Sequence, residues 1–382
     1  MDFAFSPEQQ ELRAAARQLL AGSLPAHRVS ELADSAQGWD PESWPQLASQ
    51  GWLGMSTPEE RGGLGLTTLD EAVLFEEAGA ALYPGPFFST VALSVPLLQA
   101  AGDAGADLIS GVIKGDQIFT LAWAESRGDS VAETDLATRF DHGVLTGKKK
   151  YVPDLALATD VLVTAQGSAG PQIHAVSLAD ASLTDTPSIQ VIPRPTSDLT
   201  RRVGELVLQG AASTLLLSGE AAAQSLRAMR LRAMSAAALE SVGVAQFCLT
   251  LATSYANERE QFGRPIGTNQ AISHQIADVF SATELARSLA YWAAWSVQAQ
   301  RPNMAQAVLA AKSRASEAAI FAAEVAIQVH GGIAFTWEHV LHRYYKRAQG
   351  LAAFEGPPSR LRAELAATLL GPELGPERGE MI

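Results

Sequence analysis

A long run of helical periodicity without proline constrains the fold more than any other feature of the chain. Residues Ala221–Glu258 place apolar side chains at helical spacing and contain no proline, a pattern that predicts one long helix. Three further helices are predicted over Ala271–Gln300, Asn303–Val329 and Pro358–Leu370. Helices of this length bury their apolar stripes most readily against one another, so we expect a four-helix bundle.

The preceding two thirds of the chain divide into a helical part and a β-prone part. At the N-terminus, Ser6 and Pro7 provide an N-cap and a first helical residue, and further helical spacing follows. Later, short β-prone segments are separated by turn residues and do not alternate with helices, which favours a small antiparallel barrel or sandwich. The predicted fold class is α+β, with an N-terminal helical domain (1–117), a middle β domain (118–219) and a C-terminal helical bundle (220–382).

The composition excludes several classes of function. The chain has 28 Lys and Arg against 41 Asp and Glu, a formal net charge of −13, so polyphosphate would be repelled and no nucleic acid or anionic membrane is expected as a partner. The single Cys248 excludes disulfides within the chain and cysteine-based metal clusters. We find neither a run near the ~20 apolar residues of a membrane span nor a signal peptide, and expect a soluble, cytoplasmic protein.

The common cofactor and catalytic motifs are missing from the sequence. The patterns GxGxxG after a strand, GxxxxGK[ST] and GxSxG do not occur, so we expect no Rossmann, P-loop or α/β-hydrolase site. Glu338, His339 and His342 fall near one helical face and could ligate a metal, but the seven histidines are otherwise spread over the chain. A polar helix surface is the favoured interpretation, and no metal is expected.

Two segments between helices are unusual. Residues 259–267 form a basic, amide-bearing turn that is followed by Gln270, and such groups at a helix boundary suit a pyrophosphate. Residues 328–335 contain paired glycines, which allow a backbone to approach a ligand closely. From the residues alone, an ordinary helix–helix loop and a helix C-cap are the simpler interpretations.

Taken in order, these segments resemble the acyl-CoA dehydrogenase family over nearly the whole chain. Residues 58–66 are similar to its PEExGGLGL turn, residues 259–266 to its RxQFGxPI signature, and residues 328–332 to its QxxGG motif. The helical, β and bundle order is also the family's. The resemblance implies an oxidoreductase of lipid metabolism, a flavoprotein that binds FAD at the interface of a dimer or tetramer.

The resemblance also implies which residues hold FAD. One group would reach the FAD of the neighbouring subunit, and a second group would hold the adenosine-diphosphate half. The first group is Arg259, Gln261 and Phe262, with Gln270 in support; the second is Gln328, Gly331 and Gly332.

Two segments of the middle domain depart from the family pattern. The loop at 124–130 reads Ala-Glu-Ser-Arg-Gly-Asp-Ser where the family has TEPxAGSD, and residues 151–153 read Tyr-Val-Pro where it has Trp-Ile-Thr. An aromatic face is kept and a threonine hydroxyl is lost. We therefore expect altered flavin contacts in this domain.

The resemblance assigns the catalytic base to Glu355. Desaturation needs a carboxylate to remove the Cα proton while a hydride leaves Cβ for flavin N5, and the family carries this Glu before a Gly, 27 positions after the glutamine of QxxGG. Here 355 − 328 = 27. Some relatives carry the base 26 positions before the arginine motif, which is Ala233 here, and Glu240 is expected to lie in the bundle.

One departure beside Glu355 leaves an alternative open. Pro357 and Pro358 follow where the family has residues that help to hold FAD, and proline removes a backbone donor. Glu355 could then be a surface acid in a degenerate site.

This departure, the Tyr-Val-Pro strand and the segment 330–348 resemble the actinobacterial subset that acts on steroid and other bulky acyl-CoA thioesters, often as α2β2 heterotetramers. We expect FAD-dependent α,β-dehydrogenation of such an acyl-CoA by a homo- or heterotetramer with a related subunit, with electrons passing to an electron-transfer flavoprotein. The alternatives are a non-catalytic or FAD-site-completing subunit of a heteromeric enzyme, an acyl-CoA oxidase-like enzyme that uses O2, and a metal-binding helical bundle.

Overall fold

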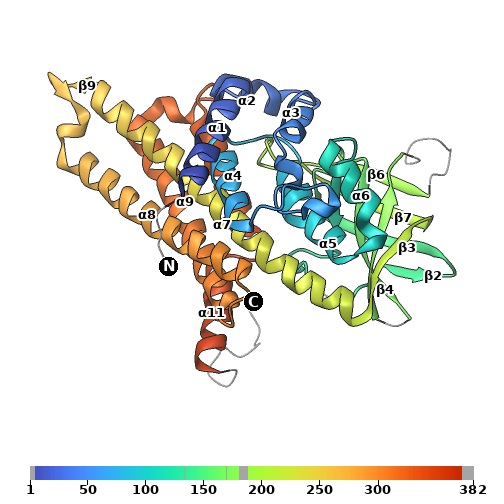
Figure 1. The fold of residues 1–382 in the computed structure, drawn as a ribbon. Coiled ribbons are helices and arrows are strands. Elements are labelled where there is room, and N and C mark those ends of the chain that lie inside the picture. Colours follow the sequence, from blue (N-terminus) through green and yellow to red (C-terminus); the bar gives the residue numbers. More distant parts are fainter. Residues whose placement is uncertain (1–4, 133, 169, 180–187, 372–382) are drawn as a thin grey trace. The chain divides into compact units, whose positions relative to one another are not determined.

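The computed structural model describes residues 5–132, 134–168, 170–179 and 188–371 (Figure 1). The chain divides into two compact units, each made of separate stretches. Unit 1 consists of Met1–Ser30, Ala72–Tyr83 and Met234–Ile382, and unit 2 consists of Glu31–Glu71 and Pro84–Ala233. These two units, made of separate stretches of the chain, do not test the predicted division into three consecutive domains. The boundaries 1–117, 118–219 and 220–382 remain a prediction.

Unit 1 is helical. The four long helices expected from the sequence are present, and a fifth, α10, which the sequence analysis did not predict, lies between α9 and α11. Two 3₁₀ turns, η4 (Ile266–Thr268) and η5 (Gly331–Phe335), connect them. The helices are α1 (Pro7–Ser23), the end of α4 (Thr68–Ala80), α7 (Gly219–Glu258) from Met234 onward, α8 (Gln270–Gln298), α9 (Met304–His330), α10 (Leu341–Ala353) and α11 (Pro358–Leu370).

The start of α1 is set by local chemistry, as the sequence predicted. The Ser6 hydroxyl accepts a hydrogen bond from the Gln9 backbone N–H at 3.2 Å, and the Gln9 side chain accepts one from the Ser6 N–H at 3.2 Å. This capping box satisfies two backbone donors that the helix itself leaves free. Pro7 then occupies the first helical position, where its missing N–H costs nothing.

Two glycines bring α4 and α7 into backbone contact within unit 1. A Cβ atom on Gly79 would overlap the carbonyl oxygen of Glu240, and one on Gly243 would overlap that of Glu76. Only glycine allows helices to approach this closely. The contact fixes the part of α4 that carries Glu76 and Glu77.

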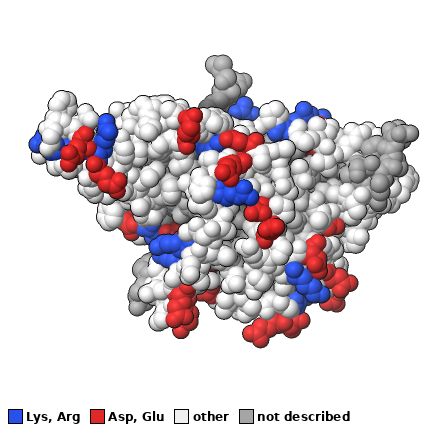
Figure 2. Space-filling view, turned by 90° about the horizontal axis from the view of Figure 1, so that it is seen from above, with Lys and Arg blue, Asp and Glu red and all other residues white. Residues whose placement is uncertain are grey.

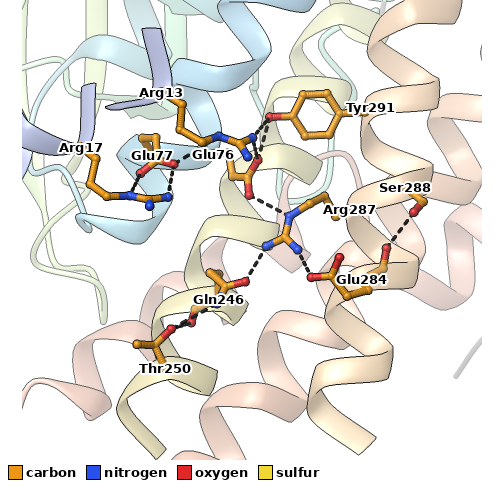
Figure 3. Close-up of polar contacts among 10 residues, drawn as sticks. All are labelled: Arg13, Arg17, Glu76, Glu77, Gln246, Thr250, Glu284, Arg287, Ser288 and Tyr291. Atoms are coloured by element: carbon orange, nitrogen blue, oxygen red, sulfur yellow. Dashed lines mark hydrogen bonds and ion pairs between the residues drawn. The ribbon is translucent and has the colours of Figure 1, made fainter. Parts of the chain in front are cut away.

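A buried ion network ties α1 to α4 and α8 (Figure 3). The Glu76 carboxylate accepts hydrogen bonds from Arg13 Nη2 at 2.8 Å, Arg287 Nε at 2.9 Å and the Tyr291 hydroxyl at 2.7 Å. Arg17 pairs with the adjacent Glu77 at 2.8 Å. Because buried charges are tolerated when they are paired and hydrogen-bonded, the network fixes α1 on the bundle.

Unit 2 combines short helices with one sheet. Its helical segments are the end of α2 (Ala26–Asp34), α3 (Ser43–Ser49), η1 (Trp52–Gly54), η2 (Glu59–Arg61), the start of α4 up to Glu71, the π-helical η3 (Phe88–Ser94), α5 (Val95–Ala100), α6 (Asp103–Lys114) and the start of α7 up to Ala233. The strands are β1 (Phe119–Ala122), β2 (Arg139–Asp141), β3 (Val144–Pro153), β4 (Asp160–Gly167), β5 (Gly170–Ser177), β6 (Ile189–Arg194), β7 (Val203–Ala211) and β8 (Thr214–Ser218).

The sheet is mixed, which corrects the expectation of a purely antiparallel barrel or sandwich. In the described residues its order is β6-β7-β3-β2-β4-β5-β8, with β1 paired to β4. The β1–β4 pair is parallel, and β2 also meets β4 in parallel at Arg139 and Gln166. Parallel pairing needs a connection longer than a hairpin turn, and the residues between Ala122 and Asp160 provide it.

Strand β3 carries a bulge at the segment that departs from the family pattern. Lys149 pairs with Leu206 of β7, and the next paired residue, Val152, faces Gly204, so two residues of β3 oppose one of β7. The extra residue Tyr151 has a φ of 55° and is half exposed. Bulges of this kind redirect a side chain and are frequent beside active sites.

Two helices are long and apolar enough to cross a membrane by length and composition alone. They are α7 and the segment Met304–Phe335, and 78% and 50% of their most apolar windows are buried inside the protein. The core helices of a bundle meet the same criterion, because they bury apolar surface against neighbouring helices.

Candidate functional site

The basic turn between α7 and α8 is a tight hairpin in unit 1. Strands β9 (Glu260–Gln261) and β10 (Arg264–Pro265) pair antiparallel, and Phe262 and Gly263 between them have φ angles of 55° and 78°. Positive φ at both central residues is the geometry of a type I′ turn. Figure 1 shows β9 at the tip where α7 and α8 meet.

The hairpin directs its polar and aromatic side chains outward. Arg259, Gln261 and Gln270 are exposed, and the Phe262 ring is 100% exposed. The Arg259 carbonyl accepts a hydrogen bond from the Ile266 N–H at 2.9 Å, which closes the turn. The exposed ring and its polar neighbours leave this surface open to a ligand or a partner.

The paired glycines lie at the end of α9, beside the same hairpin. The His330 ring stacks on Tyr255 of α7 with centroids 4.2 Å apart, and the Arg259 N–H donates to the Tyr255 carbonyl at 2.8 Å. Burial lowers the pKa of His330, so the ring is neutral in this stack at neutral pH. The fold therefore brings the arginine motif and the Gln328–Gly332 segment together.

The paired glycines leave the backbone open. Gly331 has a φ of 67° and ends α9, and an added Cβ on Gly331 or Gly332 would meet no atom within 4 Å among the described residues. The exposed Gln328 side chain lies on the last turn of α9. A ligand can thus approach this backbone closely.

The residues at this site fit the pyrophosphate and adenosine of FAD. A guanidinium, three amide side chains and an open glycine backbone are the donors that a dinucleotide phosphate needs. These side chains are exposed within this one chain, as is expected of a site completed by a neighbouring subunit. The assignment of these residues to FAD remains a prediction.

The histidines that could have ligated a metal have other partners. His339 Nδ1 accepts from the Leu341 N–H at 3.3 Å, and the His342 ring stacks on Trp337 with centroids 4.8 Å apart. Among the residues that the structure describes, no group of three His, Cys, Asp or Glu is arranged to hold a metal ion.

Glu355 lies in a strained turn between α10 and α11. Its φ is 60°, Gly356 follows with a φ of 104°, and the glutamate is only 7% exposed. The left-handed region costs a non-glycine residue about 1–3 kcal/mol and is enriched at functional sites. The turn is closed by the Gly356 N–H, which donates to the Ala353 carbonyl at 3.1 Å.

The two prolines after Glu355 have a structural explanation. Pro357 is the N-cap of α11 and Pro358 is its first helical residue, positions at which the helix makes no use of a backbone N–H. The buried position of Glu355 differs from the surface acid considered as the alternative.

The other candidate positions for a base are not suited to that role. Ala233 is buried and has no acidic group, and Glu240 is 2% exposed and pairs with Arg347 at 2.6 Å. Arg347 also donates to the Tyr83 carbonyl at 3.3 Å. Glu240 therefore belongs to a buried structural ion pair of the bundle.

In unit 2, a buried lysine joins the two segments that depart from the family pattern. Lys149 Nζ donates to Glu125 Oε1 at 2.7 Å, the Trp123 carbonyl at 3.1 Å and Thr164 Oγ1 at 3.1 Å, and the side chain is 0% exposed. The neighbouring Lys150 N–H donates to the Ala124 carbonyl at 2.7 Å. The loop at 124–130 is thereby held against the bulge of β3.

The Glu125–Lys149 pair is ionised at neutral pH. Burial alone would raise the pKa of Glu125, but hydrogen bonds from Lys149, Thr138 and the Ala137 N–H lower it to about 2. Burial lowers the pKa of Lys149 to about 8, against the attraction of Glu125. An ion pair with these donors fixes the loop rigidly.

Two buried lysines that support these sites, Lys149 and Lys312, were not predicted from the sequence. In a strand, alternate residues face the same side, so Lys149 shares the face of Leu145, which is buried. In α9, Lys312 follows Val308 by one helical turn and lies on the same apolar stripe. Both patterns place a lysine on an apolar face and could have indicated its burial. In the structure both lysines are 0% exposed.

Comparisons with known proteins match this architecture. The model of the acyl-CoA dehydrogenase N-terminal domain matches residues 6–105, and that of the C-terminal domain matches residues 216–370. The chain is 31% identical over 368 residues to acyl-CoA dehydrogenase IpdE2 of Mycolicibacterium smegmatis, covering 94% of this chain and 99% of that protein. It is 33% identical over 358 residues to IpdE2 of Mycobacterium tuberculosis, covering 93% and 95%.

Solved structures with the same fold include a variant of the steroid ACAD Tcur3481–Tcur3483, at 29% identity and a TM-score of 0.83, covering 96% of this chain and 98% of that one. The ChsE4–ChsE5 complex of M. tuberculosis gives 26% identity and a TM-score of 0.84, with 97% and 99% covered. Together with the full-length similarity to IpdE2, these findings show that the chain is an enzyme of the acyl-CoA dehydrogenase family.

Proposed function

We propose that this enzyme oxidises a bulky, steroid-derived acyl-CoA thioester to its trans-α,β-unsaturated product, with FAD as the cofactor and Glu355 as the base. The observation that carries the proposal is the buried carboxylate of Glu355, held at positive φ in a closed turn. Acyl-CoA dehydrogenation is the reaction of the family; the bulky acyl group, the bound FAD and the base are the proposed details.

In the proposed reaction, one residue acts as the base and other residues bind FAD. Glu355 takes the proton from Cα of the thioester, and its buried turn holds the carboxylate in position and limits access of water. FAD, when bound, supplies the acceptor at N5 for the hydride that leaves Cβ. Arg259, Gln261, Phe262 and Gln270 bind the FAD of the neighbouring subunit, and Gln328, Gly331 and Gly332 hold its adenosine-diphosphate half.

The similar proteins support the assignment of a steroid-derived acyl group. The similar structures include a protein described as a steroid ACAD, and the similarity to the IpdE2 proteins spans both chains almost completely. A panel of straight-chain, branched and steroid-derived CoA thioesters tests the assignment. We expect the highest kcat/KM for the steroid-derived thioesters, and a preference for short straight chains would contradict it.

Glu355→Gln tests the base. We expect kcat to fall by about 10²–10⁴-fold, the range of general-base catalysis, while the flavin-to-protein ratio stays at the wild-type value. Glu11→Gln is the matched control, because Glu11 is an exposed residue of α1. Full activity of Glu355→Gln would show that this chain does not supply the base.

A second candidate function is that of an FAD-site-completing subunit of a heterotetramer. Two similar solved structures are named for pairs of chains, and the exposed Phe262 hairpin is suited to a neighbouring subunit. If the heteromer is correct, this chain purified alone lacks flavin absorbance and recovers it on co-expression with its related subunit. A flavin-replete, active homotetramer would exclude it.

The proposed setting is cytoplasmic, with an electron-transfer flavoprotein as acceptor. The charges suit a water-soluble protein without a nucleic-acid surface. On the face shown in Figure 2, Lys and Arg side chains stand beside Asp and Glu side chains and do not gather into one basic patch. Turnover that needs an added electron-transfer flavoprotein supports this acceptor, and rapid peroxide formation without it would favour an oxidase.

A further inference from the structure

Lys312 is a fully buried lysine on α9 with a role that the proposed chemistry does not explain. Its side chain is 0% exposed, and its ammonium donates to Ser316 Oγ at 2.9 Å and to the Leu351 carbonyl at 2.7 Å. Both acceptors are uncharged. Burying an ammonium on neutral acceptors alone is expensive, so a purely structural purpose would be served better by an apolar side chain.

The acceptor on α10, the Leu351 carbonyl, lies at the C-terminal end of the helix. Leu351 is in the last turn of α10, where carbonyl groups lack the partners of the helix interior and carry partial negative charge. A cation that donates to such a carbonyl fixes the end of the helix. The Phe354 N–H shares this carbonyl, at 3.3 Å, and the turn with Glu355 follows directly.

The charge of Lys312 also acts on Glu355. Burial lowers the pKa of Lys312 to about 7, and the attraction of the Glu355 carboxylate opposes this shift. At neutral pH the amine and the ammonium of Lys312 are therefore both populated, and either form can donate to the Leu351 carbonyl at the end of α10.

We propose that Lys312 is a positioning residue for Glu355: its side-chain nitrogen donates to the last turn of α10 and so holds the turn that carries the Glu355 carboxylate. This inference rests on the proposed role of Glu355 as the base, and it adds a residue on a different helix to the machinery that presents this carboxylate.

Three variants test it. Lys312→Met keeps the length of the side chain and removes its charge and donors, and Lys312→Gln keeps a donor without the charge. Ser316→Ala is the matched control, because it removes the other acceptor of the same ammonium and leaves the contact with Leu351 intact.

Hydrogen exchange of the purified protein gives a readout that does not depend on turnover. In Lys312→Met we expect the amides of Phe354 and Gly356 to exchange about 10-fold faster, since their turn loses its clamp. Lys312→Gln is expected to restore part of this protection, and Ser316→Ala to leave it unchanged.

Steady-state kinetics of the flavin-loaded enzyme give the second readout. A misplaced base lowers kcat and leaves substrate binding largely intact, so we expect Lys312→Met to lose about 10²-fold in kcat with KM within about 3-fold. Lys312→Gln should recover part of the lost kcat, because it keeps a donor, and Ser316→Ala should resemble the wild type.

The outcomes separate this inference from the proposed function. If Glu355→Gln is inactive and Lys312→Met matches the wild type in exchange and kcat, the inference is wrong and the base assignment stands. If Glu355→Gln keeps full activity, the base assignment fails, and the exchange of Phe354 and Gly356 still decides whether Lys312 clamps the turn.

Discussion

The two buried lysines, Lys149 in unit 2 and Lys312 in unit 1, differ in the groups that accept their hydrogen bonds. Both side chains are 0% exposed. Lys149 has a carboxylate partner, Glu125, at 2.7 Å, whereas Lys312 donates to a hydroxyl and a carbonyl. Burial lowers the pKa of Lys149 to about 8 and that of Lys312 to about 7.

The two lysines have different structural effects: Lys149 fixes a loop, and Lys312 supports the turn that carries the proposed base. A lysine that pairs directly with a carboxylate neutralises it and makes it part of the scaffold, as Glu125 is in the loop at 124–130. Lys312 instead donates to the end of α10, and it acts on the turn that carries Glu355 through the backbone.

The largest expected effect on stability comes from breaking the direct pair. Lys149→Met leaves the Glu125 carboxylate without its cation, and we expect a loss of about 3–5 kcal/mol in the free energy of unfolding, measured with urea. The double variant Lys149→Met/Glu125→Gln removes the unpaired charge and should lose less than the single variant. A double variant less stable than Lys149→Met would show that Glu125 does not depend on the lysine.

Arginine pairs on the bundle should give an intermediate effect. Glu76→Gln removes the carboxylate charge that Arg13 and Arg287 share and one of its two acceptor oxygens, but both guanidinium groups keep other carboxylates. We therefore expect a loss of about 1–3 kcal/mol in urea unfolding. Glu284→Gln, at the exposed edge of the same network, should cost less than about 0.5 kcal/mol; equal losses for the two variants would contradict a network centred on Glu76.

The pH dependence of stability should separate the two lysine environments. The pKa of Glu125 is lowered from 4.5 to about 2, so its contribution is present above pH 4.5 and is lost as the pH falls toward 2. The pKa of Lys312 is lowered from 10.5 to about 7, so the unfolded chain binds more protons and stability rises with pH between these values.

Urea unfolding over a pH series checks both predicted directions in which stability changes with pH. Lys312→Met should lose the part of the rise that begins near pH 7 and keep the acid limb; a rise above pH 8 should remain, because the pKa of Lys149 is also lowered. Glu125→Gln should lose the acid limb. Identical pH profiles for wild type and Lys312→Met would mean that Lys312 titrates as it does in water.

The smallest effect should come from the uncharged partners. Thr164→Ala and Ser316→Ala each remove one hydroxyl that accepts from a buried ammonium, at an expected cost of about 0.5–1.5 kcal/mol in unfolding free energy. If Ser316→Ala were as costly as Lys149→Met, the hydroxyl, rather than the α10 carbonyl, would be the main support of Lys312.

The sequence predicted the long helices well, because they depend on local pattern. Apolar spacing without proline predicted α7. The resemblance to the family, counted from Gln328, selected Glu355, which the structure places in a buried turn at positive φ. The roles of Glu355 and of the FAD residues remain predictions until variants are measured.

Long-range pairing was harder to predict from the sequence. The parallel β1–β4 pair depends on residues about forty positions apart, and α10 is rich in charged and polar residues that hide its buried face. The roles of Lys149 and Lys312 depend on partners on other elements. Residue spacing shows which face such a lysine lies on, and it does not show what that face meets.

The most direct test of the account is anaerobic mixing of the flavin-loaded enzyme with its acyl-CoA substrate, followed by flavin absorbance. Wild type and Glu11→Gln should bleach rapidly, because removal of the α-proton by Glu355 accompanies loss of the hydride. Glu355→Gln, with the same flavin content, should stay yellow or bleach about 10²-fold or more slowly. Bleaching of Glu355→Gln at the wild-type rate would contradict the central claim that this carboxylate is the base.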